Sequence, residues 1–158
     1  MQLYVAREGG FAAATDCEVL AAAQGAVRRK FNRGPRFSSP AQVKEALVAL
    51  LGGRESEVFC VAHLDKRHRL IRFVEMFHGS IDGTAVHPRE VVKAALAYNS
   101  AGLIFVHNHP SGDFQASKAD ELITQRLKEA CALIDVRVLD HIIVGADEAV
   151  SMAESGLL

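Results

Sequence analysis

The sequence has 158 residues, of which 49% are hydrophobic and 23% are charged, so it can bury a core and has the balance of one soluble globular domain with at most a short appendage. Its 18 Lys and Arg residues against 19 Asp and Glu residues give no reason to expect a strong polyanion binder. No apolar run approaches the roughly 20 residues of a membrane-spanning helix, and the N-terminus lacks the layout of a signal peptide. We therefore expect a cytoplasmic protein without membrane contact.

The three cysteines, Cys17, Cys60 and Cys131, are odd in number, far apart and without a C-x-x-C pair. Neither a disulfide framework nor a cysteine zinc site is indicated, and we expect each cysteine to be a small packing residue. Four histidines without recognisable partners are expected on the surface or in turns: His63, His68, His78 and His87.

The N-terminal part predicts one helix after an irregular start. Residues 1–14 contain two adjacent glycines and no clear period. Thr15 and Glu18 have the spacing of a capping box, in which each side chain bonds the backbone of the other residue. Apolar residues then recur every fourth position, which predicts an amphipathic helix of about four turns: Val19, Ala23, Val27 and Phe31.

This helix ends in a basic cluster, and Gly34-Pro35 breaks it. The cluster has two interpretations. It is either a solvated helix end, favourably placed at the negative pole of the helix dipole, or a surface that contacts DNA phosphates. We assign residues 1–38 to an N-terminal helical segment and residues 39–158 to the main domain. The members of the cluster are Arg28, Arg29, Lys30, Arg33 and Arg36.

The main domain alternates predicted helices and strands. Ser39 to Gln42 is a second capping box, with proline at the first helical position, and Gly52-Gly53 ends that helix. Two β-rich runs joined by a polar turn then predict a hairpin. Further elements are a helix over 88–99, a strand over 103–106, a helix over 117–134, and strands over 136–144 and 149–152. This interleaving predicts an α/β fold in which a mixed sheet is sandwiched by helices.

The segment that follows the strand over 103–106 carries a candidate metal site. Because side chains alternate along a strand, His107 and His109 leave its end on the same face, and Asn108 points to the opposite face. Seven residues separate His109 from Ser117, and Asp120 falls in the first turn of the next helix. Two histidines and a carboxylate, with a fourth position left for water, are the donors of a catalytic zinc site. The same residues also fit a hydrogen-bonded imidazole pair and a helix cap, and capping does not exclude ligation.

The pattern His107-x-His109, seven residues, Ser117-x-x-Asp120 resembles the signature of the JAMM metalloproteases of the JAB/MPN superfamily. The strings VHPREVVKAAL, HNHPSGD and LDHIIVG are similar to the RadC branch of that superfamily, over roughly residues 39–158. The resemblance implies a JAB/MPN-like α/β/α sandwich, similar to that of cytidine deaminases. It also implies Zn²⁺ bound by His107, His109 and Asp120, and it selects Asp120 over Asp113 as the carboxylate ligand.

The resemblance further implies two catalytic residues. Ser117 matches the family serine, which is expected to hydrogen-bond the developing oxyanion or the metal water. The family glutamate stands just before a core strand, a position that Glu57 matches and for which Glu75 is the alternative. Asp140 and His141, inside an apolar strand, are either a satisfied core pair or a brace for a metal ligand.

The function that follows is zinc-dependent hydrolysis of peptide or isopeptide bonds in a protein or peptide substrate, including ubiquitin-like conjugates. An alternative is a DNA-repair-associated or mobile-element accessory protein with a structural or vestigial metal centre. A third hypothesis is a protein-interaction module that keeps the metal for folding. The full set of Glu57, His107, His109, Ser117 and Asp120 favours the enzyme, because MPN domains that serve as scaffolds commonly lack it.

Overall fold

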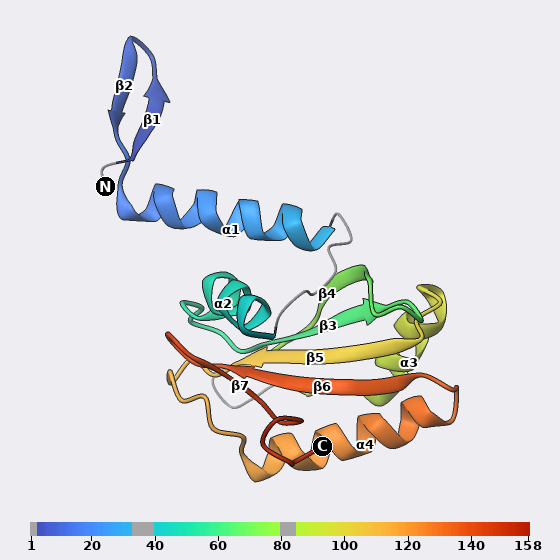
Figure 1. The fold of residues 1–158 in the computed structure, drawn as a ribbon. Coiled ribbons are helices and arrows are strands. Elements are labelled where there is room, and N and C mark those ends of the chain that lie inside the picture. The colour runs from blue at the N-terminus through green and yellow to red at the C-terminus, as the bar shows by residue number, and fades with distance from the viewer. Residues whose placement is uncertain (1–2, 33–39, 80–84) are drawn as a thin grey trace.

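A computed structural model describes residues 3–32, 40–79 and 85–158, with the backbone alone for 28–32 and 40 (Figure 1). Strands and helices are interleaved along this chain. In order they are β1 (Tyr4–Arg7), β2 (Gly10–Ala13), α1 (Asp16–Asn32), α2 (Pro40–Leu51), β3 (Val58–Leu64), β4 (Leu70–His78), α3 (Pro88–Ala97), β5 (Gly102–Asn108), α4 (Lys118–Ala132), β6 (Arg137–Val144) and β7 (Ala149–Ser151). They alternate one by one from β4 to β6.

Five strands form one mixed sheet in the order β4-β3-β5-β6-β7. Strands β5 and β6 run parallel, joined by the crossover helix α4, and the other neighbours in this sheet are antiparallel. Every residue of β3 is buried, as expected for a central strand that is covered on both faces. The predicted mixed α/β fold, including the hairpin of β3 and β4, is confirmed.

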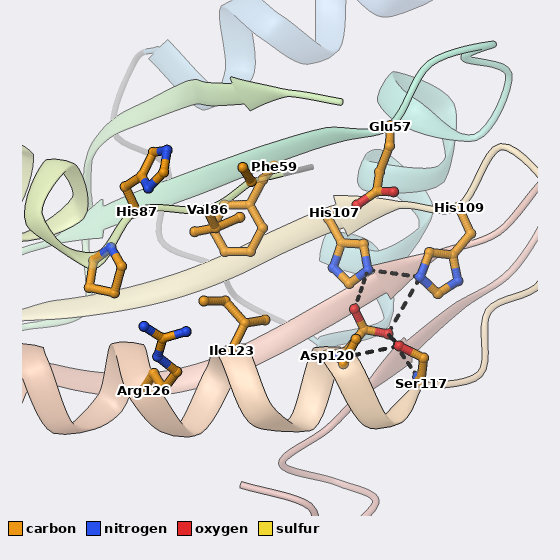
Figure 2. A pocket seen from close by; sticks show the side chains of 13 residues that line it. Glu57, Phe59, Val86, His87, His107, His109, Ser117, Asp120, Ile123 and Arg126 are labelled. Carbon is orange, nitrogen blue, oxygen red and sulfur yellow. Dashed lines mark hydrogen bonds and ion pairs between the residues drawn. The ribbon is translucent and has the colours of Figure 1, made fainter. Parts of the chain in front are cut away.

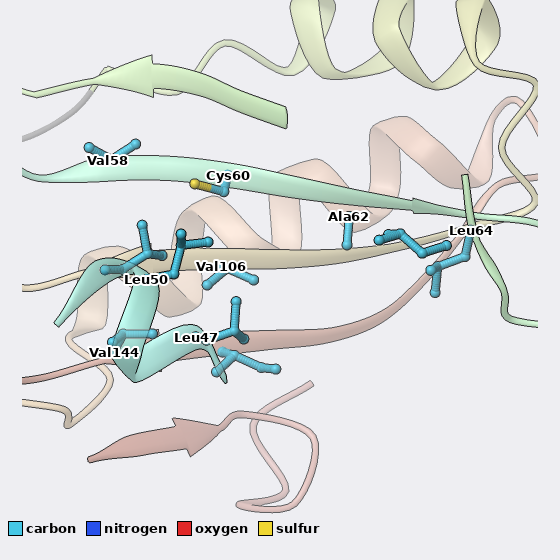
Figure 3. Packing of buried hydrophobic residues seen from close by; sticks show 11 residues of the cluster. Leu47, Leu50, Val58, Cys60, Ala62, Leu64, Val106 and Val144 are labelled. Carbon is cyan, nitrogen blue, oxygen red and sulfur yellow. The ribbon is translucent and has the colours of Figure 1, made fainter. Parts of the chain in front are cut away.

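The two faces of the sheet carry separate hydrophobic clusters, and helices cover both (Figure 1). Helix α2 covers one face, where Leu47 and Leu50 pack against alternate residues of β3 and β5 such as Cys60 and Val106 (Figure 3). Helices α3 and α4 cover the other face, whose buried residues include Phe59, Val61, Val91, Phe105 and Leu127. The side-chain period of two therefore sends Phe105 and His107 to the face that α3 and α4 cover.

The prediction of an irregular N-terminus is wrong for residues 4–13. These residues form an antiparallel hairpin in which Arg7 pairs with Gly10, and it stands away from the main sheet (Figure 1). Glu8 and Gly9 form the turn, where Gly9 has a positive φ of 92°, and Gly10, the first residue of β2, also has a positive φ (147°). Nearly all side chains of the two strands are exposed, so the alternation that marks a half-buried strand does not occur in their sequence.

Helix α1 begins where the sequence predicts. The capping box is present, because the Thr15 N–H donates to Glu18 Oε2 (3.0 Å) and the Glu18 N–H donates to Thr15 Oγ1 (3.3 Å). The helix has 17 residues, and it lies against α2 and the edge strand β4. Helix α2 begins at Pro40 as expected, but its predicted cap Ser39 lies outside the described residues. The boundary between residues 38 and 39 stays a prediction.

The burial of individual side chains corrects two predictions, one for Cys17 and one for His63. Cys60 and Cys131 are buried in the two clusters, as predicted, whereas Cys17 is exposed and packs in neither. His63, expected at the surface, is fully buried in β3. Among the helices of the described residues, none combines the length and the apolar character that crossing a membrane requires.

Candidate metal centre

Strand β5 presents the two histidines at its end. Its backbone is paired with β3 on one side and β6 on the other, so the direction of each side chain is set on both sides. His107 is buried, and its ring stacks on Phe59 of β3 with ring centroids 6.2 Å apart. His109 is partly exposed, and its N–H donates to the Val144 carbonyl (2.9 Å), which extends the pairing one residue beyond the strand.

The loop after His109 folds back, so that the start of α4 lies beside the two histidines. Gly112 takes a positive φ of 84°, and its carbonyl accepts a hydrogen bond from Ala146 (3.3 Å). Ser117 then caps α4: its Oγ accepts from the Asp120 N–H (3.2 Å), and the Ser117 N–H donates to Asp120 Oδ2 (2.7 Å). The predicted capping box is confirmed, and it turns the Asp120 carboxylate toward β5.

The three predicted ligands converge on one point (Figure 2). Asp120 Oδ1 lies 3.1 Å from His107 Nε2, and Asp120 Oδ2 lies 3.5 Å from His109 Nε2. The two Nε2 atoms are 2.9 Å apart. One donor atom from each of the three residues can be chosen so that all lie within 4.8 Å of one another. The loop thus brings Asp120 of α4 next to the two histidines at the end of β5.

The charge at this point favours a bound cation. Burial alone would raise the pKa of Asp120, but hydrogen bonds with His107 and His109 hold that pKa well below its usual range. The hydrogen bond with Asp120 raises the pKa of His109 against the opposing effect of burial. His109 Nδ1 donates to the Asp113 carbonyl (3.0 Å), so the neutral ring has its lone pair on Nε2. A cluster of nitrogen lone pairs and an anionic carboxylate attracts either a proton or a metal ion.

Asp113 is not brought to this point as a ligand. Its carboxylate Oδ1 accepts from the Gln115 N–H (2.9 Å) within the loop, and its backbone carbonyl is the acceptor for His109. The described groups of His, Cys, Asp and Glu that could hold a metal include Asp120 and not Asp113.

Glu57 reaches the same cavity from the start of β3. Its half-buried side chain points toward His107 and His109 (Figure 2), and its charge adds to that of Asp120 in raising the pKa of His109. The Glu75 carboxylate is instead bound by Arg54 through two hydrogen bonds (3.0 and 2.8 Å). The structure therefore places Glu57 beside the histidines and Glu75 in an ion pair.

Asn108, the residue between the two histidines, holds Glu57 in place through the backbone. Its Oδ1 accepts from the Val58 N–H (2.9 Å), and its Nδ2 donates to the Ser56 carbonyl (3.2 Å). The side chain thus bonds both neighbours of Glu57. The predicted direction of Asn108, opposite to that of the two histidines, is confirmed, but the sequence does not indicate its partners, which lie 50 and 52 residues away.

His141 contacts His107, as the interpretation of a brace predicts, whereas Asp140 bonds other groups. The His141 ring is fully buried and lies 2.8 Å from His107 (Nε2 to Nδ1) and 2.5 Å from Thr124 (Nδ1 to Oγ1). Burial, assisted by the neighbouring His107, lowers the pKa of His141. Asp140 accepts from the His141 N–H and from Ser151 Oγ (both 2.7 Å), which fastens the last strand. Thr124 was missed, since only its spacing of four residues from Asp120 could have indicated it.

A cavity of about 730 Å³ opens over His107, His109 and Asp120. Phe59, Val86 and Ile123 form an apolar wall, and Arg126 and His87 lie farther along the same cavity (Figure 2). The volume falls within the range of pockets that bind small substrates or short segments of larger ones.

The side chains of the predicted basic cluster lie outside the described residues. Arg28, Arg29 and Lys30 belong to the last turns of α1, and their side chains, like Arg33 and Arg36 as a whole, lie outside the described residues. DNA contact stays a prediction, which a steep loss of DNA binding with rising salt would support.

Comparison with known proteins identifies the family. A family model described as a RadC-like JAB domain matches residues 37–157. A UPF0758 protein of Nitrosococcus oceani is 57% identical over 126 residues, and one of Halorhodospira halophila is 54% identical over 129 residues. The two alignments cover 80% and 82% of this chain. They cover only 56% and 58% of the two relatives, so the chain spans little more than half the length of each. A UPF0758 protein of Vibrio cholerae is 49% identical over 140 residues, 89% of this chain and 88% of that one. The chain belongs to the RadC-like JAB domain family.

Proposed function

We propose that the chain is a zinc-dependent hydrolase that cleaves peptide or isopeptide bonds. The observation that carries this proposal is the convergence of His107, His109 and Asp120 on one point, with the Glu57 side chain facing them across a cavity. An ordinary helix cap accounts for the position of Ser117 and Asp120. It does not account for two buried or half-buried imidazoles that share that carboxylate, nor for a second carboxylate beside them.

The donors fit Zn²⁺ better than a hard cation. Two imidazole nitrogens and one carboxylate are typical of catalytic zinc, whereas Mg²⁺ and Ca²⁺ prefer oxygen ligands. Asp120 stays anionic because its pKa is lowered, and both histidines can offer Nε2. When bound there, zinc would polarise a carbonyl group and lower the pKa of a water molecule. The three side chains leave the cavity side open to that water and to the substrate.

Glu57 is the proposed general base and acid. A carboxylate in this position takes the proton of the attacking water and passes it to the leaving nitrogen, which lets the amine depart as a neutral group. Within the described part of the chain no hydrogen bond engages the Glu57 carboxylate, so it is available for this transfer. Glu75 would have to break its paired hydrogen bonds with Arg54 before it could accept a proton.

Ser117 is proposed to serve first in positioning Asp120. Its hydroxyl donates to Asp120 Oδ2 (2.6 Å) and accepts from the Asp120 N–H. Stabilisation of a developing oxyanion by Ser117 requires the hydroxyl proton to turn away from Asp120, which needs only rotation about the Cβ–Oγ bond. The helix cap can persist during that rotation, because the oxygen that accepts from the helix does not move.

The substrate that we propose is a protein or peptide, including ubiquitin-like conjugates. The apolar wall formed by Phe59, Val86 and Ile123 offers contacts to an aliphatic segment beside the scissile bond. The chain spans 56% and 58% of two of its relatives, so the substrates and partners of the whole protein are also part of this proposal.

The test compares Glu57→Gln with Glu75→Gln, two changes that keep side-chain size. The zinc-loaded proteins are incubated with internally quenched peptides and with a Lys-linked isopeptide version of them. Glu57→Gln should retain its zinc and lose about 10²- to 10⁴-fold in rate. Glu75→Gln should stay close to the parent rate. An active Glu57→Gln would remove Glu57 as the base, and a zinc-loaded parent without hydrolysis of any probe would favour a structural metal.

A further inference from the structure

We propose that Thr124 and His141 form a hydrogen-bonded relay that fixes the tautomer of His107, so that its Nε2 atom carries a lone pair toward the metal position. The inference rests on the proposed zinc site and adds two positioning residues to it. Neither residue lines the cavity, and both are buried behind His107.

The relay starts at the backbone of a ligand. Thr124 Oγ1 lies 2.5 Å from the carbonyl oxygen of Asp120, one turn earlier in α4. Two oxygens at that separation need a proton between them, and a carbonyl can only accept. The single hydroxyl proton of Thr124 is therefore directed at Asp120, and what Thr124 presents to any other neighbour is an acceptor.

That neighbour is His141. Its Nδ1 lies 2.5 Å from Thr124 Oγ1, and because the hydroxyl proton is already used, Nδ1 must carry the proton of this hydrogen bond. The His141 ring is fully buried, and its two partners are a hydroxyl and an imidazole, neither of which is an anion. A buried imidazolium without an anionic partner is costly, so the ring is neutral and its Nε2 is an acceptor.

The last step reaches the ligand. His141 Nε2 lies 2.8 Å from His107 Nδ1, so His107 is the donor and its proton resides on Nδ1. The neutral His107 ring then has its lone pair on Nε2, the atom that lies 3.1 Å from Asp120 Oδ1. Opposite tautomers along the relay would set two lone pairs against each other at Thr124, where both contacts are short.

Aromatic side chains pack around His141 and hold its ring in the orientation that the two hydrogen bonds need. Phe59 and Phe105 meet its ring edge to face, with centroids 5.5 and 5.8 Å away, which fixes the plane of the imidazole. His109 has no need of such a path, because its Nδ1 donates directly to the Asp113 carbonyl in the loop. The two histidine ligands are therefore oriented independently, one by the buried core and one by the exposed loop.

The experiment compares Thr124→Val with Thr124→Ser. Valine keeps the shape of threonine and removes the hydroxyl, whereas serine keeps the hydroxyl and removes a buried methyl group. Zinc affinity is measured against a competing chelator, together with the melting temperature of each zinc-free protein. We expect Thr124→Val to bind zinc about 10- to 100-fold more weakly than the parent. Thr124→Ser should bind zinc almost as tightly as the parent although its melting temperature falls.

A role of Thr124 in packing alone would give the reverse order of zinc affinities, and equal affinities of Thr124→Val and the parent would also overturn the relay. A second readout needs no zinc. Nitrogen-15 spectra of the imidazoles in the zinc-free parent at mildly alkaline pH should show His141 and His107 protonated on Nδ1. A proton on Nε2 of His141 would refute the relay directly. If the parent binds no zinc, the proposed function fails, but these spectra still decide the tautomers.

Discussion

Replacement of Asn108 by alanine separates the positioning of Glu57 from metal binding. The side chain is 1% exposed, and it bonds Val58 N–H and the Ser56 carbonyl on either side of Glu57. Alanine leaves the Val58 N–H buried without a partner, which costs about 1–3 kcal/mol, whereas the exposed Ser56 carbonyl can turn to water. We therefore expect the free energy of unfolding to fall by about 2 kcal/mol.

The assay is urea unfolding of the zinc-free protein, followed by zinc analysis and hydrolysis by the reloaded protein. Asn108→Ala should retain zinc, because the ligand histidines are not bonded by this side chain, and it should lose rate because Glu57 is no longer held from both sides. Asn108→Asp, which keeps an acceptor for the Val58 N–H, separates the two hydrogen bonds. An Asn108→Ala protein that is as stable as the parent, or one that loses zinc while its stability is unchanged, would contradict this role of Asn108.

Two further predictions concern pH and packing. Burial lowers the pKa of His63 to about 4, while an unfolded histidine titrates near 6.5, so acid favours the unfolded chain, which binds the extra proton. The free energy of unfolding should fall by about 3 kcal/mol in total between about pH 6.5 and 4 through this residue. His63→Gln should reduce this loss of stability in acid, as measured by urea unfolding across that pH range, and a pH dependence equal to that of the parent would contradict the role of His63. At Gly145, a Cβ atom would lie 2.5 Å from the Gly112 carbonyl, so Gly145→Ala should displace the loop after His109, weaken zinc binding and cost about 1–3 kcal/mol. Gly53→Ala, where nothing lies within 4 Å of the added atom, is the control; equal zinc titrations and melting temperatures of the two variants would contradict the close approach.

The parts of the site that could be predicted from sequence are those with a local cause. A strand alternates its side chains, so the spacing of His107 and His109 alone puts them on one face. A capping box joins residues three apart, so Ser117 and Asp120 were recognisable as a helix start that brings a carboxylate with it. The choice between Glu57 and Glu75, in contrast, came from resemblance to a family and gained its physical reason only from the Arg54 ion pair.

The parts that could not be predicted depend on contacts between distant positions. Thr124 and His141 are 17 residues apart on different elements, and a threonine in a helix or a histidine in a strand carries no signal of the other. The N-terminal hairpin was missed for a different reason. Its exposed strands have no buried face, so residues such as Tyr4 and Phe11 show no alternation with polar positions, and only Gly9-Gly10 could have indicated a turn.

The most direct test of the account is the zinc content of protein that is purified without a chelator. We expect one zinc ion per chain in the parent, and a sharp loss in both His107→Ala and Asp120→Ala, because each removes one of three ligands. Asp113→Ala is the matched control, because it removes a carboxylate from the same loop. Among the described residues this carboxylate bonds the Gln115 N–H, and it takes no part in the Ser117 cap of α4. Zinc content equal to that of the parent in both ligand variants, or a zinc-free parent that takes up no added zinc, would contradict the proposed metal site.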